Sequence, residues 1–424
     1  MDISYRQIAK IHDSASLTLW RALRISDARP VLLKTGGHSN DDTSETIRNE
    51  AELLSSVAGD NIVGFLGTDD SDSNPRLILD DPGGMPLADC FAAGPPDIDT
   101  FLCIALQAAQ ALEKVHAAGI VHGGINPENF LYHPERRQIK LLGFATATFV
   151  PKYRQPFDSP ARLAASLPYV SPEQTGRMNR SVDYRTDFYS LGVTFYELAT
   201  GQLPFVSDDP LEIVHAHLAV VPPDPITLNA EIPATISRII MKLMSKTAEE
   251  RYQSAAGLRR DLERCASEWR QQRQIGSFPL GRDDRSTRLQ IPQELYGREQ
   301  DVAALLSIFA DVAEGATTLL LISGYSGVGK SSLVHEMYRP ITERRGFFLE
   351  GKFEQYRRDI PFFAWIQALD GFVQLLLRCP EQELAQWRQA LQIALSANGR
   401  VMTDLLPTLE LVIGPQPPVP DLNG

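Results

Sequence analysis

The stretch VHGGINPENF, residues 121–130, places an asparagine seven residues after a histidine, with two glycines directly behind the histidine. Before it, residues 97–119 repeat apolar side chains at i, i+3 and i+4 spacing, and a glycine ends the repeat. The repeating side chains are Phe101, Ile104, Ala105, Ala108, Leu112 and Val115. We therefore expect a helix over 97–119 that leads into a loop starting at His122.

The bulk composition indicates a globular protein of two or three domains, since 424 residues exceed one ordinary core. Hydrophobic residues make up 43% and charged residues 22%. A net charge of −12 and a pI near 5.2 argue against nucleic acid or an anionic membrane surface as the main partner. The sequence predicts neither partner.

The cysteines and the apolar runs favour the cytoplasm. Cys90, Cys103, Cys265 and Cys379 form no C-x-x-C pair, which is typical of reduced structural thiols. The N-terminus lacks the basic-then-apolar order of a secretory signal, and no apolar run is long enough to span a bilayer. We expect a cytoplasmic protein.

The first 80 residues have strand patterns around one helix. TLWRALRI (18–25) and RPVLLKTG (29–36) predict a hairpin, and residues 62–70 and 76–80 predict further strands. Residues 43–57 predict a helix with a cap at Thr43 or Ser44.

The chain after residue 97 is predicted to be mainly helical. Residues 183–201 are apolar on most sides, which favours a buried helix, and 234–246 and 254–269 are amphipathic. The polar, Pro/Gly-punctuated segment 269–294 shows no period and predicts an interdomain linker.

GYSGVGKSS, residues 324–332, contains a full G-x-x-x-x-G-K-[ST] motif. We expect TTLLLIS (317–323) to be a short buried strand before it and a helix to follow it. Glycines let the loop point its N–H groups at phosphate oxygens, and the helix N-terminus favours the same anion. The motif predicts an ATP site with Mg²⁺, in which Lys330 reaches the β/γ-phosphates and the Ser331 hydroxyl ligates the metal. The expected nucleotide-binding residues are Gly324, Ser326, Gly327, Gly329, Lys330, Ser331 and Ser332.

Hydrolysis also needs a carboxylate at the end of a second strand. GFFLEGKF (346–353) ends its expected strand too early, at Glu350, and LELVIGPQPP (409–418) has no aspartate. We therefore expect this domain to be partial, truncated before its metal-binding carboxylate, with poor nucleotide binding and negligible hydrolysis.

Residues 1–266 resemble the eukaryotic-type Ser/Thr protein kinase fold, and 295–424 resemble the start of a signal-transduction P-loop ATPase domain. This order of domains, kinase-like and then ATPase, is similar to that of bacterial hybrid sensor proteins in which sensory and histidine-kinase modules follow. The resemblance implies an α+β bilobal kinase fold, with an N-lobe (1–84) and a C-lobe (85–268). The linker (269–294) and a partial α/β P-loop NTPase domain (295–424) follow.

The resemblance assigns roles to several residues. Lys34 matches the lysine that holds the α/β-phosphates and Glu50 its helix partner, unless the two form only a surface ion pair. Asn129 matches a metal-ligating asparagine. Four further residues match architectural positions, namely His122, Glu173, Asp187 and Arg251.

The departures from the kinase pattern affect the positions of the catalytic base, the metal ligand and the nucleotide contacts. Gly124 stands where the resemblance expects the catalytic-base aspartate, and Gly143 stands where it expects the Mg²⁺-binding aspartate. Asn126 replaces a lysine, residues 11–20 lack glycine, and Leu32 crowds the adenine position. Catalytic residues are therefore not intact, which predicts a pseudokinase.

Alternatives remain open at this point. The motifs could be misaligned, with Glu128, Asp158 or Asp183 serving as the missing acids. The chain could be a weak, unconventional Ser/Thr kinase that uses Lys34 and its partners. It could also be an ATPase with the kinase-like lobe as a sensor. The leading hypothesis is a pseudokinase that regulates or scaffolds other signalling domains or proteins.

Overall fold

The computed structural model describes residues 5–13, 17–36, 41–69, 75–149, 167–175, 182–285, 297–325, 328–337, 340–341, 344, 346–353, 362–377 and 381–417. The chain divides into two compact units. One comprises Met1–Asp301 and Ser323–Glu336, and the other comprises Val302–Ile322 and Met337–Gly424.

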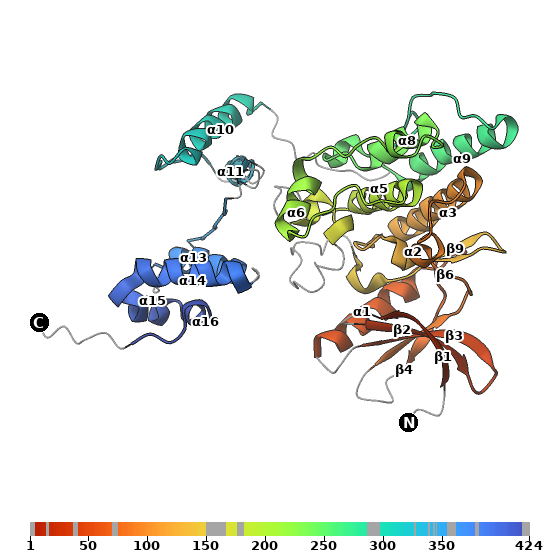
Figure 1. The fold of residues 1–424 in the computed structure, drawn as a ribbon, viewed down its shortest axis with the longest axis horizontal. Helices are drawn as coiled ribbons and strands as arrows, with labels where there is room; N and C mark the ends of the chain where they lie inside the picture. Colours follow the sequence, from red (N-terminus) through yellow and green to blue (C-terminus); the bar gives the residue numbers. More distant parts are fainter. Residues whose placement is uncertain are drawn as a thin grey trace, which may run out of the picture. The chain divides into compact units, whose positions relative to one another are not determined.

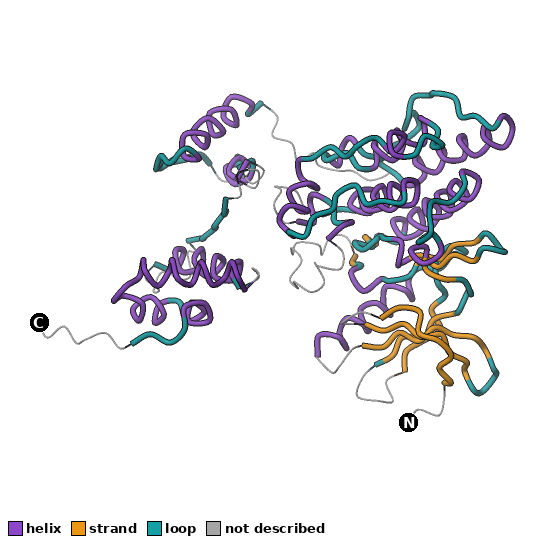
Figure 2. The backbone as a smooth tube through the Cα atoms, in the orientation of Figure 1, coloured by secondary structure: helices purple, strands orange, loops and turns teal. Residues whose placement is uncertain are grey.

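The N-lobe is a five-stranded antiparallel sheet with one helix against it (Figures 1 and 2). Its strands, in the order β1-β2-β3-β5-β4, are β1 (Tyr5–Asp13), β2 (Leu17–Arg24), β3 (Arg29–Gly36), β5 (Arg76–Asp80) and β4 (Phe65–Asp69). The predicted hairpin is β2–β3. Helix α1 (Asp41–Ser56) begins before the predicted cap at Thr43 or Ser44, so that prediction was wrong.

The C-lobe begins with short strands around the predicted loop. β6 (Met85–Pro86), β8 (Phe130–His133) and β9 (Gln138–Leu141) form one sheet, and β7 (Ile120–Val121) pairs with β10 (Thr148–Phe149). Four 3₁₀ turns belong to the same part of the chain: Pro127–Asn129, Phe144–Thr146, Leu167–Tyr169 and Pro172–Thr175. The loop that carries His122 therefore lies between two small sheets.

Helices make up the rest of the C-lobe (Figure 1). They are α2 (Leu87–Cys90), α3 (Ile98–Ala117), α5 (Arg185–Thr200), α6 (Pro210–Ala219), α7 (Pro225–Leu228), α8 (Ala234–Leu243) and α9 (Ala255–Gln272), with a 3₁₀ turn at Ala248–Glu250. The Asp97 side chain caps α3 by accepting from the Thr100 N–H, and the chain leaves α3 through Gly119 at φ 78°. A single core runs from Leu19 in the N-lobe to Phe278.

The start of the predicted linker belongs to the C-lobe. Helix α9 continues to Gln272, and Phe278 is buried in the core at 5% exposure. The reason is that Ile275, Phe278 and Leu280 are apolar side chains that pack on the core, a weak signal within a polar segment.

The C-terminal part of the chain is helical where it is described. Its elements are α10 (Glu299–Ala313), α11 (Lys330–His335), α13 (Phe363–Leu376), α14 (Glu381–Leu395), α15 (Gly399–Leu405) and α16 (Glu410–Ile413), with 3₁₀ turns at Ser396–Asn398 and Pro407–Leu409. Phe347, Phe372 and Trp387 pack edge to face, beside a core that includes Val373 and Leu376.

Two strand predictions in this part were wrong. Residues 317–323 form no strand, and Leu319 and Leu321 are 86% and 84% exposed. Residues 346–350 are also without regular structure. A strand is stabilised by bonds to a neighbouring strand, and none of the described residues offers one to either segment. None of the described helices combines the length and apolar character needed to cross a bilayer.

Candidate functional site

Asp187, in the first turn of α5, supports the loop that starts at His122. Its carboxylate accepts from the N–H groups of His122 (2.9 Å) and Gly123 (2.8 Å) and lies 2.8 Å from His116 Nε2. Burial lowers the pKa of His122, whose Nε2 lies 3.1 Å from the Leu142 carbonyl. Asp187 and His122 thus fix the backbone of the loop from beneath.

Lys34 and Glu50 form a buried ion pair across β3 and α1. Lys34 Nζ donates to both carboxylate oxygens of Glu50 at 2.8 and 2.7 Å, and the residues are 7% and 1% exposed. The Phe144 N–H donates to Glu50 Oε1 at 2.9 Å. The alternative of a surface ion pair is therefore excluded by burial.

Glu173 and Arg251 form a second buried ion pair, in the C-lobe. Arg251 Nη1 and Nη2 donate to the two oxygens of Glu173 at 2.6 and 2.8 Å, and Thr186 Oγ1 donates at 2.8 Å. Burial raises the pKa of Glu173, but the Arg251 charge and these bonds outweigh it and leave the pKa below its ordinary value.

The positions of Gly124 and Gly143 are filled by other side chains. A Cβ on Gly143 would lie 2.5 Å from Asn129 Cγ, and a Cβ on Gly124 would lie 2.5 Å from Thr146 Oγ1. Gly143 adopts φ 84°, a left-handed conformation that favours glycine. Asn129 Nδ2 donates to the Gly124 carbonyl at 2.7 Å, and Thr146 Oγ1 donates to the His122 carbonyl at 3.1 Å.

The acids considered as substitutes lie elsewhere or are engaged. Asp183 binds the Arg185 guanidinium at 2.7 Å. Glu128 lies 3.8 Å from His12 and is more than half exposed. Asp158 lies outside the described residues.

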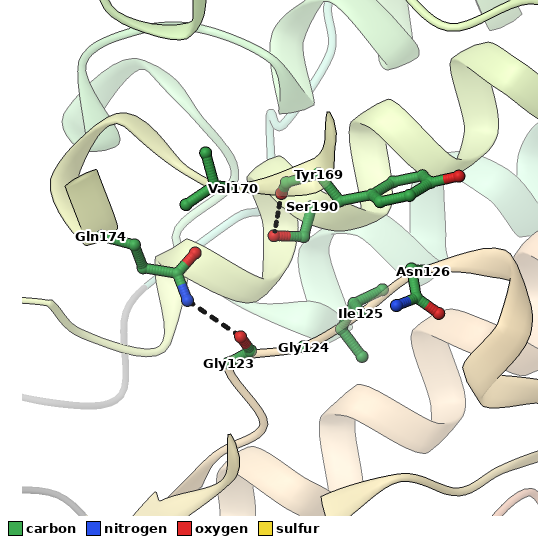
Figure 3. Close-up of a pocket in the computed structure, with 8 residues that line it drawn as sticks. All are labelled: Gly123, Gly124, Ile125, Asn126, Tyr169, Val170, Gln174 and Ser190. Atoms are coloured by element: carbon green, nitrogen blue, oxygen red, sulfur yellow. Dashed lines mark hydrogen bonds between the residues drawn. The ribbon is translucent and has the colours of Figure 1, made fainter. Parts of the chain in front are cut away.

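A small pocket borders the same loop (Figure 3). Its lining residues are Gly123, Gly124, Ile125, Asn126, Tyr169, Val170, Gln174 and Ser190. Gln174 Nε2 donates to the Gly123 carbonyl at 2.9 Å, and Ser190 Oγ donates to the Tyr169 carbonyl at 2.8 Å (Figure 3). Sequence reasoning missed Gln174 and Thr146. For Gln174 a signal existed, because it directly follows Glu173.

In the described part of the glycine-rich loop, the lysine side chain is hydrogen-bonded to carbonyl groups of the same loop. Lys330 Nζ donates to the carbonyls of Gly324 (2.9 Å) and Tyr325 (2.8 Å). Gly329 precedes α11 with φ 86°. Ser331 and Ser332 follow Lys330 on α11, whereas Ser326 and Gly327 lie outside the described residues.

Comparison with family models identifies both parts of the chain. Residues 15–261, more than half of the chain, match the protein kinase domain. The chain belongs to the protein kinase domain family. Residues 294–422 match the AAA ATPase domain, so a kinase domain is followed by an AAA-type P-loop domain, as predicted.

Relatives include proteins named as histidine kinases and as serine/threonine-protein kinases. The chain is 31% identical over 405 residues to hybrid signal transduction histidine kinase G of Dictyostelium discoideum, covering 75% of this chain and 12% of that protein. It is 25% identical to histidine protein kinase 1 of Candida albicans, covering 73% and 14%. It is 30% identical to a probable serine/threonine-protein kinase of Clostridium perfringens, covering 55% and 33%. The chain therefore spans a third or less of each of these relatives.

Both families use ATP and Mg²⁺ in general, so the residues of the kinase cleft can be tested for their fit to the metal. Mg²⁺ prefers several oxygen ligands in octahedral geometry, commonly including carboxylates. In the kinase cleft Asn129 Nδ2 donates to the Gly124 carbonyl, so only its Oδ1 could ligate a metal, and a Cβ added at Gly143 would collide with this side chain. Among the residues that the structure describes, no group of three His, Cys, Asp or Glu side chains could hold a metal ion. Neither Gly124 nor Gly143 offers a carboxylate for Mg²⁺ in the described kinase cleft.

Proposed function

We propose that the kinase domain is a pseudokinase that regulates or scaffolds a signalling protein, coupled to an ATP-binding P-loop domain. The observation that carries this proposal is the filling of two positions, Gly124 by Thr146 and Gly143 by Asn129. Loss of a general base alone reduces the rate about 10²–10⁴-fold. Loss of the metal ligand also removes the cation that neutralises charge on the transferred phosphoryl group.

The retained residues have an architectural role in this proposal. Lys34, Glu50, Glu173 and Arg251 form buried pairs, and Asp187 holds backbone N–H groups. Each of these contacts stabilises the bilobal fold without needing nucleotide. Such a fold offers a fixed surface for a partner.

A weakly active Ser/Thr kinase is the second candidate. It is favoured by the intact contact of Lys34 with Glu50, because the resemblance assigns Lys34 to the nucleotide phosphates. This candidate requires a metal held by groups other than those at residues 124 and 143.

The names of the relatives suggest a signalling setting for this chain. Two of them are named histidine kinases and one a serine/threonine-protein kinase. We propose that this chain acts in signalling in the cytoplasm, with other signalling domains or proteins as partners. In the P-loop domain, Lys330 and Ser331 would hold the phosphates and Mg²⁺ of ATP, and we expect little hydrolysis.

A γ-phosphate transfer assay on the full chain, with Mg²⁺ or Mn²⁺, tests the proposal. We expect no autophosphorylation above a blank, either in the chain itself or in Lys330→Ala. Robust autophosphorylation that survives Lys330→Ala but is lost in Lys34→Ala would establish the second candidate instead. Circular dichroism of both variants checks that they are folded.

A further inference from the structure

Residues 274–284, here called the strap, lie between the parts matched by the two families and yet are bonded to the C-lobe. The Gly276 N–H donates to Glu268 at 2.8 Å, and Thr235 Oγ1 donates to the Gly276 carbonyl at 2.8 Å. Phe278 is buried under the Arg264 guanidinium, 4.1 Å from its ring centroid. The strap is thus held by polar and apolar contacts together.

The strap ends at Asp284, whose two carboxylate oxygens both bind the start of α9. They accept from the Gln253 N–H (2.5 Å) and from Ser254 Oγ (2.7 Å). Ser254 caps α9 by accepting from the Gly257 N–H at 3.0 Å. A Cβ on Gly257 would lie 2.5 Å from Asp284 Cγ, so the glycine permits this close approach.

Gln253 continues the contacts toward the centre of the C-lobe. Its Nε2 donates to the Ala248 and Glu249 carbonyls at 3.1 and 3.0 Å, and its Oε1 accepts from Arg185 at 3.0 Å. Arg251, two residues earlier, is the ion-pair partner of Glu173. The segment 248–254 therefore joins the strap to this buried pair.

Glu173 is followed by Gln174, which donates to the Gly123 carbonyl beside Gly124. The path therefore reaches the loop that carries Gly124.

A second set of hydrogen bonds also joins the strap to the segment 248–254. Asp261 accepts from both the Gly281 N–H and the Tyr252 hydroxyl at 2.7 Å. Connected hydrogen bonds and ion pairs of this kind can carry coupling between two sites when the network can change between two arrangements.

We propose that the strap is a relay between the chain beyond Arg285 and the catalytic-loop face of the kinase domain. A displacement of that chain acts on Asp284, then on the segment 248–254, and then on the Glu173–Arg251 pair and the loop at Gly123. The relay does not depend on whether the domain transfers phosphate, so its failure leaves the pseudokinase proposal untouched.

Amide hydrogen exchange of the full chain tests the relay. In Asp284→Ala we expect exchange to rise about tenfold not only in 248–257 but also in 170–175 and 122–124, because loss of the carboxylate leaves the Gln253 N–H without its acceptor. The control is Asp283→Ala, an exposed neighbour, for which we expect no rise in these segments. A rise confined to 253–257 and the strap would overturn the relay and leave Asp284 as a helix cap only.

Gln253→Ala gives an independent arm if Asp284→Ala fails to fold. Its backbone N–H still binds Asp284, so we expect the strap to stay protected while exchange at 170–175 rises. We expect the double variant Asp284→Ala/Gln253→Ala to show no further rise at 170–175, since both changes break one path. Additive rises there would contradict the proposal.

Discussion

Gly143→Ala tests whether Asn129 occupies the space of the missing metal ligand. The new Cβ meets Asn129 Cγ at 2.5 Å, and φ is 84°. The left-handed backbone alone costs a non-glycine residue about 1–2 kcal/mol. Displacing Asn129 also breaks its bond to the Gly124 carbonyl, worth about 1 kcal/mol. The total expected loss is about 2–3 kcal/mol.

Gly119→Ala is the matched control, because Gly119 has φ 78° and its added Cβ meets no described atom within 4 Å. Scanning calorimetry of the full chain should show Gly143→Ala melting about 2–4 °C below the control, the shift that about 1 kcal/mol gives in a domain of this size. In an Asn129→Ala background the excess should vanish. The reasoning is refuted if Gly143→Ala costs no more than Gly119→Ala, or if the excess persists without Asn129.

Three further predictions concern buried charges. Lys34→Met leaves the Glu50 carboxylate buried without its partner and should cost about 3–5 kcal/mol in urea unfolding, part of which Lys34→Met/Glu50→Leu should recover. The pKa of Glu173 lies below its ordinary value of 4.5, so its contribution to stability is present above that pH and is lost as pH falls through the folded-state pKa. In unfolding curves measured over a series of pH values, Glu173→Gln should abolish this part of the loss of stability in acid. Burial, aided by the Lys246 charge, lowers the pKa of His217 to about 3, so on acidification the unfolded state binds the proton first. The free energy of unfolding should therefore fall by about 1 kcal/mol from about pH 7 to about pH 5.5. If His217→Gln leaves this dependence on pH unchanged, the prediction is contradicted.

The sequence predicted the bilobal kinase fold because its periodic patterns and its motifs agree. The hairpin at 18–36 and the helix at 98–117 follow from local apolar spacing and, for the helix, from the glycine that ends it, which need no tertiary information. The resemblance to the kinase family also predicted that Lys34 and Glu50 pair, and they do so across a strand and a helix.

Other features depend on contacts that no local pattern encodes. Thr146 and Asn129 fill space left by Gly124 and Gly143, which is a property of packing across the loop. The sequence predicts a linker at the strap because the few apolar residues there show no period. The strand predicted at 317–323 failed for the converse reason, because its local pattern is strong but the described residues offer no strand to pair with it.

Isothermal titration of ATP into the full chain carrying Lys330→Ala, with and without Mg²⁺, tests most directly whether the kinase cleft holds a metal–nucleotide complex. With the P-loop lysine removed, we predict no saturable, Mg²⁺-dependent heat. Stoichiometric binding that requires Mg²⁺ and disappears when Lys34→Ala is added would contradict the account, because it would place a cation in a cleft whose two carboxylate positions are glycines.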